Sequence, residues 1–215
     1  MQLKIQILSE KKDQTFCSEK LEWVISFAKG LETHYGSPPL ITTEVFCGNN
    51  ILQLDADLFV SPVSAHQVKV GFKPMALYNE GMITQEVGIS WITISDNSFT
   101  GADALSNFLL FFVGFVMIPN TFGWHMTDFS HFKAILKSGN NGTLISFDSI
   151  RHEDLADVAG LMVWLNKKGI FIQNLHEAYA QLHTAFKKKE IPALINVTNY
   201  LVLKTTGLAL LIKNQ

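Results

Sequence analysis

Three side chains that could bind a transition metal lie close together near the middle of the chain. His125, Asp128 and His131 form the pattern H-x-x-D-x-x-H, and imidazole with carboxylate suits zinc, iron or manganese. On one continuous helix, two steps of three residues leave the first and third members about 120° apart. Both histidines can therefore face one ion only if the segment begins in a turn. The alternative is a helix start, with Asp128 near its N-terminus and both histidines at the surface.

Two further groups of titratable residues have spacings that suit catalysis less well. His176 and His183 are seven residues apart, with Glu177 after the first, whereas a zinc-binding H-E-x-x-H motif needs histidines at i and i+4. The run 152–154 (His-Glu-Asp) projects in three directions from a helix and is typical of an acidic helix N-terminus. The sequence contains no G-x-S-x-G elbow, no G-x-x-x-x-G-K-[ST] loop and no G-x-G-x-x-G loop. We therefore expect a non-enzymatic protein without a cofactor.

Composition narrows the class of partner and the compartment. Hydrophobic residues make up 47% of the chain, charged residues 17%, and the formal net charge is -2. Nucleic-acid-binding modules carry a basic stripe, so we expect no nucleic-acid partner. Cys17 and Cys47 match no metal-binding spacing, and the first eight residues alternate like a strand and lack a signal-peptide core. These features predict reduced thiols in a cytoplasmic protein.

An uncharged, apolar run extends from Phe108 to Ile118 and is followed by Pro119. Spanning a bilayer takes roughly 20 apolar residues, so the run predicts a helix buried on all sides, and we expect no membrane partner. Residues 100–103, Thr-Gly-Ala-Asp, have the T-x-x-D form of a capping box that would open this helix. Phe111, Phe112 and Phe115 cannot all face one side, so we expect the sheet to cover one side and other helices the other.

The N-terminal half predicts strands with one helix among them. A strand over residues 1–8 is followed by a helix with Ser18 as N-cap, and Gly36 begins the run that ends this helix. Its predicted core stripe is Leu21, Val24, Ile25, Ala28 and Leu31. Strands are predicted over residues 41–46, 51–60, 67–72 and 83–94, with a separator at Ser61-Pro62. These segments predict a mainly antiparallel sheet with helices packed on it.

The C-terminal half predicts alternating strands and helices. A short helix over residues 128–137 carries Phe129, Phe132 and Leu136 on its inner face. A strand over residues 143–147 precedes a helix over residues 152–168, whose stripe is Leu155, Val158, Met162 and Leu165. A strand over 170–172, a helix from Asn174 to about Phe186 and strand-like segments over 193–202 and 208–212 complete a β-α-β-α-β segment. We expect one α+β domain over residues 1–215, with its candidate seam at 95–100.

One segment resembles a known family. The stretch Leu144-Ile145-Ser146-Phe147-Asp148, with the predicted helix, short strand and second helix after it, resembles the second half of an anti-sigma-factor-antagonist (STAS) domain. The small loop that carries a phosphorylatable serine in that family falls near residues 154–157, Asp-Leu-Ala-Asp, which have no hydroxyl. The resemblance therefore implies no phosphorylation switch here, and we assign the chain to no family on this basis.

These features favour a cytoplasmic protein-binding module, for example an inhibitor or immunity-type protein that neutralises a partner protein with a basic cleft. Large aromatic residues dominate interface hot spots, and the loop at 120–124 is the candidate surface. Phe122, Trp124 and Asp128 are its predicted partner-binding residues. The alternative for Trp124 is that it packs inward and stabilises the junction between the helices on either side of the loop. The alternative is a small-ligand-binding protein or a metal-dependent enzyme that uses His125, Asp128 and His131.

Overall fold

The computed structural model describes residues 2–9, 14–35, 42–49, 56–72, 89–98, 100–116, 129–165, 191–197 and 207–214 of the chain. In this part the α-helices are α1 (Gln14–Tyr35), α2 (Ala104–Val116) and α3 (Phe129–Leu136). The strands are β1 (Gln2–Ser9), β2 (Thr42–Asn49), β3 (Leu58–Ser64), β4 (Gln67–Phe72), β5 (Ser90–Asn97), β6 (Asn141–Ser146), β7 (Val158–Leu165), β8 (Ala193–Val197) and β9 (Gly207–Lys213). Two short 3-10 helices, η2 (Phe147–Ser149) and η3 (His152–Leu155), lie between β6 and β7.

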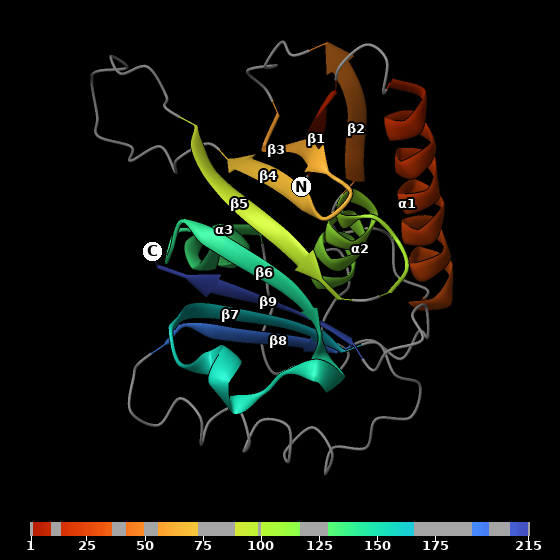
Figure 1. Ribbon diagram of the computed structural model, residues 1–215. Helices are drawn as coiled ribbons and strands as arrows, with labels where there is room; N and C mark the ends of the chain where they lie inside the picture. The colour runs from red at the N-terminus through yellow and green to blue at the C-terminus, as the bar shows by residue number, and fades with distance from the viewer. Residues whose placement is uncertain are drawn as a thin grey trace, which may run out of the picture.

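The nine strands form one mixed sheet in the order β2-β1-β3-β4-β5-β6-β9-β7-β8 (Figure 1). β3, β4 and β5 are antiparallel neighbours, and β9 is antiparallel to both β6 and β7. β1 is parallel to β2 and β3, β5 is parallel to β6, and β7 is parallel to β8. The pairing of β5 with β6 continues the sheet from the N-terminal half of the chain into the C-terminal half.

The prediction of an antiparallel N-terminal sheet is confirmed for β3, β4 and β5 and wrong for β1. β1 runs parallel to β2 over its whole length. Parallel neighbours need a crossover connection, usually a helix, and α1 provides it here. The predicted separator at Ser61-Pro62 is also wrong, because both residues lie within β3. The register shifts between Pro62 and Ser64, an irregularity of the kind that lets a strand accept proline.

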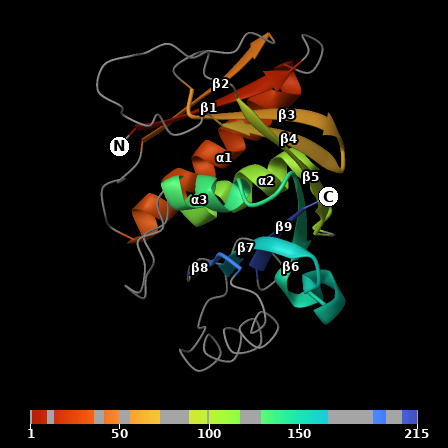
Figure 2. The same cartoon turned by 90° about the vertical axis from the view of Figure 1, so that its left-hand side faces the viewer.

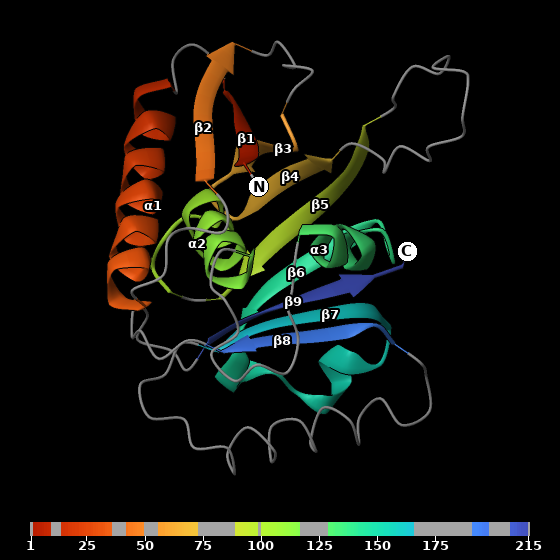
Figure 3. The same cartoon turned by 180° about the vertical axis from the view of Figure 1, so that it is seen from behind.

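All three α-helices lie on one face of the sheet (Figures 2 and 3). Alternate strand residues point toward them and form the main core with the inner faces of the helices. α2 contacts α1 on one side and β3, β4, β5 and β7 on the other. Because β7 lies well away from β3 in the strand order, the sheet must curve around α2 to make both contacts.

The buried apolar helix predicted from residue 108 onward is confirmed within α2. Every residue from Ala104 to Phe115 is buried. The ring of Phe112 lies 5.0 Å from that of Phe132 and 5.9 Å from that of Phe129, both on α3. The sheet and the other two helices thus cover α2 from different sides, as expected. No helix in the described part of the chain is long and apolar enough to cross a membrane.

The helix predicted over residues 152–168 is wrong. Residues 152–155 form the 3-10 helix η3, and Val158–Leu165 is the strand β7. β7 lies between β9 and β8 and is buried on both faces, so nearly all of its residues are apolar. A continuous apolar run fits a buried helix and a buried strand equally well. The resemblance to an anti-sigma-factor-antagonist domain fails here too, because it requires a helix at this point.

A second, smaller core lies on the face of the sheet opposite the helices. It contains apolar side chains of β6, β7 and β9, and Leu155 of η3 packs into it. Along β7 the two cores alternate: Met162 and Trp164 belong to the main core, and Leu161 and Val163 to the second one. Burial on both faces explains why the C-terminal strands read as apolar runs without alternation.

Other predicted elements agree with the structure in part. α3 matches the helix predicted over 128–137, with Phe129, Phe132 and Leu136 buried. α1 begins at Gln14, so Ser18 lies inside the helix and the prediction that it is the N-cap is wrong. The strand predicted over 170–172 and the helix predicted over 174–186 lie outside the described residues.

Candidate protein-binding surface

Most of the predicted site residues lie outside the described part of the chain. Phe122, Trp124, His125 and Asp128 all belong to residues 117–128, which the structure does not describe. His131 is described and lies exposed on α3. Within the described ranges no group of three or more metal-ligating side chains could hold a metal ion. The predicted metal cluster and the predicted aromatic loop therefore stay predictions.

The structure places two other large aromatic residues at the surface of one helix. Phe16 and Trp23 of α1 are 42% and 45% exposed. They are seven residues apart, two helical turns, so their directions differ by only about 20°. Glu19 lies between them and Glu22 next to Trp23, and both glutamates are exposed. We call Phe16, Glu19, Glu22 and Trp23 the α1 stripe.

The opposite side of α1 anchors the helix to the main core. Cys17 and Leu21 are buried there, and Ile25 packs against the same core. The predicted core stripe is confirmed at Leu21 and Ile25, whereas the side chains of its other three members lie outside the described part. Cys17 is buried and forms no disulfide. Because the buried residues occupy one side of α1, the α1 stripe is held on the other side, away from the sheet.

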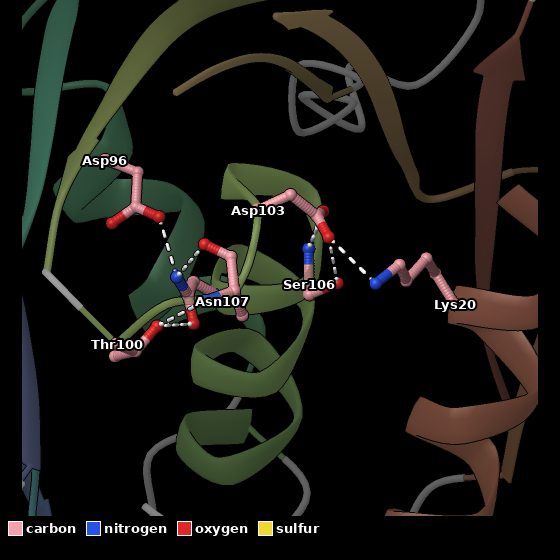
Figure 4. A network of polar contacts seen from close by, with 7 residues as sticks. Lys20, Asp96, Thr100, Asp103, Ser106 and Asn107 are labelled. Atoms are coloured by element: carbon pink, nitrogen blue, oxygen red, sulfur yellow. Dashed lines mark hydrogen bonds and ion pairs between the residues drawn. The ribbon is translucent and has the colours of Figure 1, made fainter. Parts of the chain in front are cut away.

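A clamp between α1 and α2 holds Phe16 in place. Lys20 Nζ lies 2.9 Å from Asp103 Oδ2 (Figure 4) and 5.1 Å from the centroid of the Phe16 ring. The ammonium group therefore forms an ion pair with one residue and a cation–π contact with the other. The position of the Lys20 ammonium group is set by Asp103, which is only partly exposed and lies at the start of the buried helix α2.

Asp103 is itself fixed, because it is the N-cap of α2. The backbone N–H of Ser106 donates to Asp103 Oδ1 at 2.9 Å, and the Ser106 hydroxyl donates to Oδ2 at 2.9 Å. Burial favours the protonated carboxyl, but hydrogen bonds from Lys20 and Ser106 outweigh it and lower the pKa of Asp103. The predicted capping box is therefore wrong: Asp103 caps the helix, and Thr100 lies outside it.

A buried amide fastens the preceding loop to the same helix (Figure 4). Asn107 Nδ2 donates to Asp96 Oδ2 at 2.7 Å and to Ser98 Oγ at 3.1 Å, and Asn107 Oδ1 accepts from Thr100 Oγ1 at 2.8 Å. Satisfied buried polar groups of this kind make a local structure rigid. Asp96, the last residue but one of β5, accepts from Asn107 and from the backbone N–H of Ser98, so the network supports the connection between β5 and α2.

We expect acid to weaken the clamp. Asp103→Asn keeps a capping side chain but cannot ionise. At pH 7 we expect it to cost about 0.5–1 kcal/mol, after allowing for solvent screening. Because the folded pKa of Asp103 lies below the ordinary 3.8, this stabilisation is complete above 3.8 and is lost as the pH falls through the folded value. The melting temperatures of wild type and variant should therefore converge toward pH 3.

Lys20→Gln is the matched control for this experiment. It removes the cation while leaving the Asp103 cap in place. In the Lys20→Gln background, the pH-dependent stability difference that Asp103→Asn produces should therefore shrink, and the part that remains comes from the hydrogen bonds of Ser106. A gap between wild type and Asp103→Asn that is equal at pH 7 and pH 3 would contradict the assignment of the ion pair.

The charge of the α1 stripe follows from the clamp. Lys20 is paired with Asp103, whereas Glu19 and Glu22 have no ion-pair partner among the described residues. The exposed side of α1 therefore combines two aromatic rings with two carboxylates. Aromatic rings flanked by charges are the kind of group that carries binding energy at protein interfaces, and the four residues of the α1 stripe include no hydroxyl, thiol or imidazole.

Sequence reasoning assigned no partner-binding residue to this helix, although a signal was present. Leu21 and Ile25 define the inner side of the predicted helix, and positions 16 and 23 fall on the other side when the helix is extended toward its N-terminus. The prediction began the helix at Ser18, which left Phe16 outside it.

A comparison with protein families, curated proteins and solved structures found no match for this chain.

Proposed function

We propose that this chain is a non-enzymatic protein-binding module that acts in the cytoplasm and binds its partner through the α1 stripe. The observation that supports this function is the pair of exposed aromatic residues, Phe16 and Trp23, on one side of a helix whose other side is anchored in the core. Tryptophan is enriched in the few residues that carry most binding energy at interfaces.

The geometry favours a groove in the partner rather than a flat surface. A helix that binds in an apolar groove presents its anchors on one side, for example at i and i+7, and Phe16 and Trp23 have this spacing. The clamp holds Phe16 before binding, which reduces the side-chain entropy lost on association. The α1 stripe can therefore bind without first ordering its own helix.

The charges of the α1 stripe favour a partner with a basic cleft. Glu19 and Glu22 would meet lysine or arginine side chains on the rim of the groove, and complementary charge speeds association and excludes wrong partners. A protein that fills a basic cleft would block access to it, so we infer an inhibitor or immunity-type role for this module.

Affinity capture with the purified chain tests the proposed function. Wild type and the double variant Phe16→Ala with Trp23→Ala are each incubated with extract of cells that encode the chain, and bound proteins are quantified. We expect at least one specific partner, with affinity reduced by about 2 kcal/mol or more, roughly thirtyfold, in the double variant. Circular dichroism should stay unchanged, because both side chains are exposed. Adding the chain to the purified partner should also inhibit the partner's own activity.

Three further variants sharpen the test. Trp91→Ala removes a tryptophan of similar exposure outside α1 and should leave capture unchanged. Glu19→Gln with Glu22→Gln should reduce the salt dependence of binding. Trp124→Ala probes the loop predicted from the sequence. Equal capture by wild type and the α1 double variant, or a loss confined to Trp124→Ala, would contradict the α1 stripe as the binding surface.

A further inference from the structure

Trp91 is an exposed aromatic side chain on the face of the sheet opposite the helices. Its neighbour Ile92 belongs to the main core, and successive strand residues point to opposite faces. Trp91 and Thr93 of β5 therefore share the outer face, and Trp91 is 42% exposed there. Trp91 is therefore separate from the α1 stripe, because α1 lies on the opposite face of the sheet.

The indole of Trp91 is fixed by what lies beneath it. Gly71 of β4 pairs with Trp91, and a Cβ added at Gly71 would lie 2.7 Å from Cζ3 and 2.8 Å from Cε3 of the indole. The six-membered ring therefore covers the glycine in the space that any other side chain would fill. The buried ring of Phe59 lies beside it, with centroids 6.4 Å apart. Trp91 thus offers a ring surface that needs no reordering before a ligand stacks on it.

The polar surroundings of the indole carry positive charge. Lys69 of β4 is exposed and lies two residues before Gly71 on the same face, about 7 Å away along the strand. Strands β3, β4 and β5 contain two charged residues, Lys69 and Asp96. Asp96 points to the helices and binds Asn107, so Lys69 is the charged residue of these strands on the outer face. Lys69 has no ion-pair partner among the described residues. Thr93 is partly exposed, and the Gln67 amide donates to the Ser95 hydroxyl at 3.5 Å.

We propose that Trp91 and Lys69 form a binding site for a mononucleotide. The base would stack on the exposed indole, and the phosphate would pair with the Lys69 ammonium, whose flexible stem allows it to follow the anion. The Thr93 hydroxyl would face the ribose, because Thr93 lies two residues from Trp91 on the same face and pairs with Lys69. An aromatic ligand with a positive charge would be repelled by Lys69. An uncharged aromatic ligand would make no ion pair with Lys69, so an anionic aromatic ligand fits the site best.

The dimensions of the site favour one nucleotide over a nucleic-acid strand. Proteins that bind single strands use several stacking side chains and a groove with many positive charges. The described part of this face offers one exposed ring and one exposed lysine on β3–β5, and the whole chain has a net charge of -2. Each added phosphate would therefore meet no further cation on these strands.

Equilibrium dialysis of the purified chain with AMP, adenosine and a four-residue oligoadenylate tests the proposal. Wild type should bind AMP at millimolar concentration, and adenosine more weakly. Trp91→Ala should weaken both at least about fivefold, because one stacked base contributes roughly that much or more. Lys69→Gln should weaken AMP to the level of adenosine and leave adenosine unchanged. Trp23→Ala, in the α1 stripe, is the control that should bind like wild type.

Several results would overturn this site. Absence of AMP binding to wild type would do so, as would AMP binding that survives Trp91→Ala or equal affinities of wild type for AMP and adenosine. Tighter binding of the oligoadenylate than of AMP would replace the mononucleotide by a single strand. These outcomes do not depend on the α1 stripe, so the proposed protein-binding function can fail or hold independently of them.

Discussion

Phe112→Ala is expected to lower the free energy of unfolding by about 3–5 kcal/mol, the usual cost of removing a buried phenylalanine. Phe112 is completely buried and packs against Phe108 of its own helix and against Phe129 and Phe132 of α3. Removing the ring would leave a cavity between two helices, and neither can collapse into it without losing its contact with the sheet. A loss of this size is a large part of a typical domain's stability. Urea denaturation followed by circular dichroism measures it.

Phe16→Ala is the matched control, because the same substitution at an exposed position removes few contacts. We expect it to change the free energy of unfolding by no more than about 0.5 kcal/mol. The protein carrying Phe112→Ala should still unfold cooperatively if the rest of the core keeps its packing. Equal effects of the two substitutions would mean that α2 is not enclosed as the structure shows.

Gly114→Ala is expected to destabilise the chain by about 1–3 kcal/mol, although alanine has a higher helix propensity than glycine. Alanine normally stabilises a helix interior over glycine by about 1 kcal/mol. Here a Cβ on Gly114 of α2 would overlap the indole of Trp164, which is completely buried in β7. Both elements are held by the core, so neither can move away without strain. The sign of the change is therefore set by packing and not by helix propensity.

A double-mutant cycle with Trp164→Leu separates the two contributions. Trp164→Leu alone should destabilise the chain, since it removes a buried aromatic side chain. In that background Gly114→Ala should be neutral or stabilising, because the added methyl group can occupy part of the vacated space. Additive destabilisation in the double variant would show that Gly114 is needed for a reason other than its approach to Trp164.

The C-terminal end of α2 is also held by hydrogen bonds from a distant strand. Asn196 of β8 donates its amide to the carbonyl oxygens of Gly114 and Phe115, at 3.4 and 2.7 Å. The last carbonyls of a helix have no partner within the helix. A strand at the far edge of the sheet therefore supplies hydrogen bonds to the end of α2.

Local patterns in the sequence determined the elements whose residues carry their own signals. The apolar run from Phe108 onward is longer than most strands and too short to span a bilayer, which favours a buried helix, and α2 contains the run as far as Val116. α3 was predictable because Phe129, Phe132 and Leu136 repeat at helical spacing. β4 was predictable because Val68, Val70 and Phe72 alternate with other residues. In each case the exposed and buried sides differ within a few residues.

Tertiary structure alone decided the elements that are buried on every side and the contacts between distant residues. Residues 158–165 are apolar whether they form a helix or a strand, and only pairing with β9 and β8 makes them β7. Lys20 and Asp103 are far apart in the sequence, so no spacing rule relates them, and their contact follows from the packing of α1 on α2. Whether a tryptophan is exposed, like Trp23, or buried, like Trp164, depends on which elements pack against it. Burial is a property of the assembled chain, and a sequence pattern reports it only where one side stays polar.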